Sequence, residues 1–412
     1  MLPYKWQFAP RFRRNAFGWQ SDTPIQRIKE ALVEIKAVAK KEPVLAAEGA
    51  VLFLEKLAPA IDQVDSSSGS IGGAVNHAIE TLVPIIAKAG VNALARQRLL
   101  ERLWTALYQD AMPYLELMGD CWGELCASPE IASRWADDLM PTVKNVWADD
   151  TAGHHGFFKG TTACLSALYA ARRYDELLTL LESSRRQEWY YRCWGAKALA
   201  VQGKHAEAIQ YAEDSRHVST PVAGIARFCE ALLLDSGFAD EAYARYAVDA
   251  TWASTNLARF RAIAKKYPQV PPETILRDLV ARDPGQEGKW FAAAKDAGLF
   301  DLAIELANRS PADPRTLIRA ARDFSLKRPD FAMAAGMTAL HGMILGYGYE
   351  INRTDVLDAY AAVMQAAAEA GTEEASIKAD MRALLADKGT GGAFVQRVLA
   401  PHLAAGAIQE TR

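Results

Sequence analysis

The chain has 412 residues, of which half are hydrophobic and about a quarter are charged, and this composition excludes an intrinsically disordered protein. Its net charge of -3 gives no general affinity for nucleic acid or membranes. The five cysteines do not cluster as a disulfide framework would, and the first residues lack the apolar core of a signal peptide. We therefore expect a cytoplasmic protein.

Residues 1–23 form a basic and aromatic N-terminal arm. Residues 1–41 carry nine Lys or Arg and three acids, although the whole chain is acidic. Cations bind phosphates and aromatic rings stack on bases, so the arm is a candidate site for single-stranded nucleic acid. The candidate contacts are Arg11, Arg13, Arg14 and Trp19. The alternatives are that the aromatic residues fix the arm to the protein, or that the arm contacts a protein or an acidic lipid surface.

Residues 24–150 are predicted to be a divergent helical region. Thr23 and Pro24 mark a helix start, and Lys40, Lys41 and Pro43 mark its end. Further helices are expected at about 44–63, 73–88, 92–109, 112–126 and 129–148. Prolines within these runs predict kinks or earlier helix ends, at Pro59, Pro84 and Pro141.

A Ser- and Gly-rich loop at 65–73 precedes one of these helices. Free amides at a helix start can hold an anion, which makes Ser67, Ser68, Gly69 and Ser70 a candidate anion-binding loop. The loop lacks the Gly-Lys-Ser/Thr of a nucleotide phosphate loop, and Asn76 stands where a calcium loop needs Glu. The alternative is a long turn with its own helix cap.

A second unusual loop, GHHGFFKG at 153–160, lies near Cys121, Cys126 and Cys164 in sequence. A zinc site is not favoured, because adjacent histidines rarely ligate together and Cys121 and Cys126 would point to different sides of a helix. We predict no metal, no cofactor and no catalytic residue, since no known catalytic motif is present. An enzyme with a cryptic site near these two loops remains an alternative.

The middle of the chain repeats a helix-turn-helix pattern. The segments 167–182, 198–213, 232–247 and 293–308 place Arg172, Gly203, Gly237 and Gly298 at the turn, with separations of 31, 34 and 61 residues. This pattern resembles the tetratricopeptide repeat. The best copy, 194–214, has large, small and turn residues at the expected places, namely Trp194, Leu199, Gly203, Ala208 and Ala212.

The resemblance implies a right-handed all-α solenoid of helical hairpins over residues 157–310, whose groove binds another protein or peptide. Residues 250–288 would supply a divergent repeat. The whole chain also resembles a bacterial family of helical proteins that has no assigned activity. In the cluster 189–194, which leads into the best copy, Trp189, Tyr190 and Arg192 are candidate partner-binding residues, because aromatic residues and arginine dominate binding hot spots. The alternative is that one face of this helix belongs to the core.

Residues 311–412 are predicted to be a C-terminal helical cap, including a helix over 355–370 and a flexible joint at 388–392. The uncharged stretch 331–349 is interpreted as a buried helix rather than a membrane span, because it is rich in glycine.

The predicted function is a non-enzymatic scaffold or adaptor that binds a protein or peptide in a solenoid groove. A nucleic-acid-associated protein that uses the N-terminal arm is the principal alternative.

Overall fold

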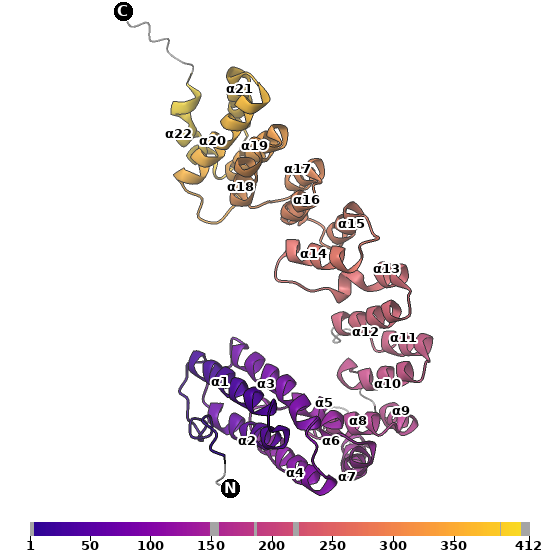
Figure 1. Ribbon diagram of the computed structural model, residues 1–412. Coiled ribbons are helices and arrows are strands. Elements are labelled where there is room, and N and C mark those ends of the chain that lie inside the picture. The colour runs from indigo at the N-terminus through magenta and orange to yellow at the C-terminus, as the bar shows by residue number, and fades with distance from the viewer. Residues whose placement is uncertain (1–3, 149–155, 185–187, 217–221, 388, 405–412) are drawn as a thin grey trace, which may run out of the picture. The chain divides into compact units, whose positions relative to one another are not determined.

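The structure is a computed structural model that describes residues 4–148, 156–184, 188–216, 222–387 and 389–404. Within these ranges it contains twenty-two α-helices, α1 to α22, one short 3-10 helix, η1, and no strand (Figure 1). The all-α fold class is confirmed.

The chain divides into two compact units, Met1–Ile225 and Ala226–Arg412. The division falls inside α12 (Val222–Asp235), and therefore within the segment predicted to form repeats. Each unit is described by itself below.

The first unit contains the predicted N-terminal helices with boundaries close to those expected. They are α1 (Asp22–Ala39), α2 (Pro43–Ile61), α3 (Ser70–Ala87), α4 (Ala93–Gln109) and α7 (Pro129–Ala148). Pro59, Pro84 and Pro141 each lie inside a helix, so all three helices continue past their proline.

The single helix predicted at 112–126 is also wrong. This segment begins as an irregular loop and continues as two short helices, α5 (Leu117–Asp120) and α6 (Trp122–Cys126). The buried Asp110 carboxylate accepts the amide of Leu115 at 2.8 Å, which fixes the loop and prevents a helix from starting at residue 112. Cys121, with φ −92° and ψ 2°, separates the two short helices.

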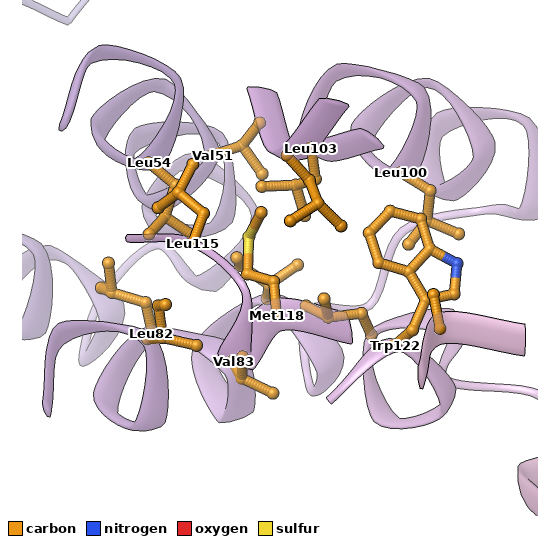
Figure 2. Close-up of a cluster of buried hydrophobic side chains, with 14 of the residues drawn as sticks. Val51, Leu54, Leu82, Val83, Leu100, Leu103, Leu115, Met118 and Trp122 are labelled. Carbon is orange, nitrogen blue, oxygen red and sulfur yellow. The ribbon is translucent and has the colours of Figure 1, made fainter. Parts of the chain in front are cut away.

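The first unit has a core to which α2, α3, α4 and the short α5 and α6 contribute side chains. Figure 2 shows their side chains converging, and every labelled residue is buried: Val51, Leu54, Leu82, Val83, Leu100, Leu103, Leu115, Met118 and Trp122.

The first unit continues with α8 (Thr161–Ala170). Three helices that form hairpins follow it, and they are α9 (Tyr174–Ser183), α10 (Trp189–Val201) and α11 (His205–Glu213). Helix α8 is buried from Thr161 to Leu168, because α5, α6 and α7 cover it.

The four predicted turn positions share one backbone geometry. Arg172, Gly203, Gly237 and Gly298 have φ of 61°, 78°, 83° and 75°. The residue after each turn position donates its amide to a carbonyl five residues earlier, as in Lys204 to Leu199 and Phe238 to Leu233. This is the hydrogen bond that closes a helix through a left-handed residue. The predicted helical turns are therefore confirmed.

The second unit continues after α12 with helices only, within the described residues. They are α13 (Ala239–Ala250), α14 (Asn256–Lys266), α15 (Pro272–Arg282), η1 (Glu287–Trp290), α16 (Phe291–Asp296), α17 (Phe300–Arg309), α18 (Pro314–Phe324), α19 (Pro329–Leu345), α20 (Arg353–Ala370), α21 (Glu374–Leu384) and α22 (Gly392–Leu403).

The uncharged stretch 331–349 supplies most of α19, which packs between α18 and α20. Gly336 allows the approach of α20, because a Cβ there would collide with Val363. Among the residues that the structure describes, no helix combines the length and the apolar character needed to cross a membrane. Lys388, in the predicted joint, lies outside the described residues.

Candidate interaction surface

The aromatic residues of the N-terminal arm are largely used in packing. The arm has six aromatic side chains, and four of them are buried, namely Trp6, Phe8, Phe12 and Phe17. Phe8 and Phe12 both contact Phe53 of α2 edge-on, with ring centroids 5.4 and 5.0 Å apart. The Glu34 carboxylate accepts the amides of Gln7 and Phe8 and holds the arm against α1. Rings that pack in this way are not available to stack on bases.

The predicted contacts of the arm have different surroundings. Arg11 forms an ion pair with Glu30 at 2.7 Å, and Arg14 lines a pocket with the acidic residues Glu55, Asp62 and Asp110. Arg13 is exposed, and 72% of the surface of Trp19 is accessible to solvent. The structure does not bring these four side chains together into one nucleic-acid groove.

The loop that precedes α3 satisfies its own backbone groups. Asp65 accepts the amide of Ser67 at 2.9 Å, and the Ser68 hydroxyl contacts the amide and hydroxyl of Ser70. Gly69 adopts a left-handed conformation with φ 72° immediately before the helix. This hydrogen bonding is that of a turn that is closed by its own side chains, and it places the Asp65 carboxylate beside an amide that an anion would need.

The described part of the second loop, residues 156–160, borders an apolar pocket. Residues 153–155, including both histidines, lie outside the described residues. The pocket has a volume of about 350 Å³ and is lined by Leu107, Asp110, Ala111, Pro113, Glu116, Phe157 and Lys159. Phe157 is 63% exposed, so its ring is presented to solvent at the pocket. The Lys159 ammonium donates to the carbonyl oxygens of Tyr108 and Asp110 at the end of α4.

The cluster Trp189–Trp194 divides between core and surface. Tyr190 is 43% exposed, whereas Tyr191 and Trp194 are buried. Arg192 is also buried: it donates to the Ser215 hydroxyl at 2.8 Å, and its guanidinium lies 3.9 Å from the centre of the Tyr211 ring. The prediction that Arg192 projects toward a partner is therefore corrected, because its side chain links α10 to the end of α11. Trp189 is half-buried and packs over Gly224.

Two glycines bring α5 and α6 into close contact with α8. A Cβ on Gly119 would collide with the Thr162 side chain, and one on Gly123 would collide with the Ser166 carbonyl oxygen. The Ser166 hydroxyl then connects the helices, because it accepts the Gly123 amide at 2.9 Å and donates to the Asp120 carbonyl at 2.8 Å. Asp120 of α5 and Glu116, which precedes α5, are close enough to α10 to interact electrostatically with Tyr190, and Asp120 also interacts with Lys197.

These residues form what we call the Tyr190 surface: Glu116, Asp120, Tyr190 and Lys197, together with the adjoining pocket. Glu116 joins the two parts, because it lines the pocket and also acts electrostatically on the Tyr190 hydroxyl. Burial raises the pKa of Asp120 to about 6, a shift that Glu116 increases and Lys197 opposes. Burial, Asp120 and Glu116 together raise the pKa of Tyr190.

Within the described part of the chain, the carboxylates of Glu116 and Asp120 have no hydrogen bond or ion pair. The nearby cations are engaged elsewhere, since Lys159 binds backbone carbonyls and the Lys197 ammonium lies 4.2 Å from the centre of the Trp194 ring. Glu230 of the second unit is different. Its carboxylate accepts the Tyr267 hydroxyl at 2.6 Å and the Lys266 ammonium at 2.8 Å. Burying a carboxylate without hydrogen-bonding partners costs free energy, and a bound ligand can supply those partners.

The cysteines near this surface are not activated. Burial raises the pKa of both Cys121 and Cys193 to about 11, which disfavours the reactive thiolate. No group of three or more potential metal ligands occurs among the residues that the structure describes.

Comparison with known proteins returned no matching family model, no matching curated protein and no matching solved structure. The tetratricopeptide resemblance therefore depends on the repeat pattern and the matching turns.

Sequence reasoning identified Tyr190 but missed Glu116, Asp120 and Lys197. The available signal was the spacing of Gly119 and Gly123, because glycines four residues apart on a helix indicate close packing against a neighbour.

Proposed function

We propose that this protein is a non-catalytic interaction scaffold that binds an extended segment of a partner protein on the Tyr190 surface. The observation that carries this proposal is the exposed Tyr190 ring beside the partly buried Asp120 carboxylate, which has no hydrogen bond or ion pair among the residues that the structure describes. Aromatic side chains of this kind dominate the binding energy of protein interfaces, and the neighbouring pocket offers a site for an apolar side chain.

The repeat geometry supports the same function. Four helices end with the same hydrogen-bonding pattern, as expected of tetratricopeptide-type hairpins. We propose that these hairpins stack as a right-handed solenoid and that the protein acts in the cytoplasm. In such an array the first helix of each hairpin contributes to the binding groove. Tyr190 and Lys197 lie on the first helix of their hairpin, α10.

The principal alternatives receive less support. A nucleic-acid site on the arm would require exposed aromatic rings, and four of its six rings are packed against the first unit. An enzyme site near either loop would require convergent polar groups and an activated nucleophile. The amides of Ser67 and Ser70 are already satisfied, and burial disfavours the thiolates of Cys121 and Cys193.

The test is quantitative affinity purification from the native cell, using wild-type protein, Tyr190→Ala and a control, Tyr349→Ala. Tyr349 is an 80% exposed tyrosine in the second unit, so its loss removes a comparable ring from a different place. We expect a protein recovered in stoichiometric amounts with wild type and Tyr349→Ala to be depleted with Tyr190→Ala. Identical recovery with all three forms would contradict the proposed function.

A further inference from the structure

Building on the proposed function, we infer that the segment bound at the Tyr190 surface is cationic and apolar. A lysine or arginine of the partner would lie against Glu116 and Asp120. A neighbouring aliphatic side chain would enter the pocket beside Phe157.

The apolar part of this specificity comes from the pocket walls. Leu107, Ala111, Pro113 and Phe157 present hydrocarbon surface around a volume of about 350 Å³. That volume accommodates one large aliphatic side chain with the adjoining backbone. Phe157 is 63% exposed without a ligand, and an entering side chain would cover its ring.

The cationic part comes from an imbalance of charge. The carboxylates on and around this surface are those of Glu80, Asp110, Glu116, Asp120 and Glu124, as their effects on neighbouring groups and the pocket lining show. The ammonium groups are those of Lys159 and Lys197, and each already has a partner. Among the described residues, the carboxylates of Glu116 and Asp120 have no hydrogen bond or ion pair, so a partner cation can pair with them, whereas a partner carboxylate would be repelled.

The geometry favours a peptide cation over a metal ion. No cluster of three metal-binding side chains is present among the described residues, and Tyr190 adds an aromatic face that attracts lysine and arginine. Nucleic acid is disfavoured, because its phosphates would face the same carboxylates.

The inference can be tested with purified full-length protein and fluorescein-labelled peptides. The first peptide alternates leucine and lysine with glycine and serine spacers, the second replaces every lysine by glutamate, and the third replaces every leucine by serine. Fluorescence anisotropy near neutral pH measures the affinity of each peptide. We expect the leucine-lysine peptide to bind about tenfold or more tightly than either of the others.

Two variants locate the binding site. Glu116→Gln combined with Asp120→Asn keeps the side-chain shapes but removes both charges, and it should weaken the leucine-lysine peptide about tenfold. Phe157→Ser should weaken it about fivefold or more without disturbing the core, because this ring is exposed. The matched control, Asp138→Asn with Glu207→Gln, removes two charges from exposed positions on α7 and α11 and should leave binding unchanged.

The inference is overturned if the glutamate peptide binds as well as the lysine peptide, if no leucine-lysine peptide binds, or if the charge-removing variant behaves like its control. The proposed function is judged separately, by partner recovery with Tyr190→Ala. A partner that depends on Tyr190 but whose binding segment is acidic would retain the function and reject the cationic ligand.

Discussion

Asp120 lies at the end of a four-residue helix, where burial favours its protonated form. The ionisable groups that influence it, or that it influences, lie on α10 or next to α5. They are Glu116, which precedes α5, Cys121, which separates α5 from α6, and Tyr190, Cys193 and Lys197 of α10. Glu80 of α3 and Glu124 of α6 act on the neighbouring Cys121. Lys197 is the cation that opposes the rise in the Asp120 pKa.

This environment predicts a pH dependence of stability. The pKa of Asp120 is about 6 in the folded protein, compared with 3.8 for an unperturbed carboxyl. Because folding raises this pKa, the contribution of Asp120 to stability is present below 3.8 and is lost as the pH rises through about 6. Denaturant unfolding of wild type and Asp120→Asn should therefore show Asp120→Asn gaining stability relative to wild type across that window.

A second variant identifies the cause of the shift. Glu116→Gln should lower the pKa of Asp120, since Glu116 contributes to raising it, and NMR titration of the carboxyl carbon would measure this change. A stability difference between wild type and Asp120→Asn that does not vary with pH would show that the Asp120 carboxyl is not perturbed by folding.

The residue scale also shows where sequence reasoning fails. Tyr190 and Arg192 were both predicted to be partner-binding residues, because the composition of the cluster favours an interface. The structure exposes one and buries the other, since residues two positions apart lie on different sides of a helix. Which side faces the core depends on α11 and Ser215, and neither can be located from the cluster itself.

At the scale of elements, the helix turns are the best-predicted feature. Glycine tolerates a positive φ. Because glycine recurs directly after the apolar ends of predicted helices, Gly203, Gly237 and Gly298 could be predicted as the turn residues. Arg172 was found through the sequence around it, although arginine is unfavourable at its φ of 61°. The repeat pattern therefore predicted backbone geometry even where the residue type did not.

Replacing Arg172 with glycine should stabilise the protein. The left-handed conformation costs arginine about 1–2 kcal/mol that glycine does not incur, and the Arg172 side chain is exposed. Gly203→Ala, at the matching turn of the next hairpin, should destabilise the protein by a similar amount. Urea unfolding midpoints measure both changes, and shifts in the same direction for the two variants would exclude turn strain as the cause.

At the scale of the whole molecule, the all-α class was predictable because hydrophobic periodicity is a local property of the sequence. The Tyr190 surface was not, because it depends on contacts between segments far apart in the chain. Gly123 and Ser166 are 43 residues apart, and their hydrogen bond helps to hold α6 against α8. The solenoid arrangement remains a prediction, supported by the four matching turns.

The division into two units makes a prediction about cooperativity. Leu103 is fully buried in the core of the first unit, and Leu340 occupies the equivalent environment in α19 of the second. Either leucine replaced by alanine should cost about 2–5 kcal/mol, because a cavity remains in a packed core. Because the two leucines belong to different compact units, we expect the loss to be confined to the unit that carries the substitution.

Hydrogen exchange measured by mass spectrometry tests this expectation, because it reports local opening along the whole chain. Leu103→Ala should accelerate exchange in α2, α3 and α4 and leave α18, α19 and α20 unchanged, and Leu340→Ala should give the reverse pattern. Acceleration of both sets by either variant would mean that α12, which spans the boundary, couples the units into one cooperative structure. Ligand binding at the Tyr190 surface would then be expected to protect the second unit as well as the first.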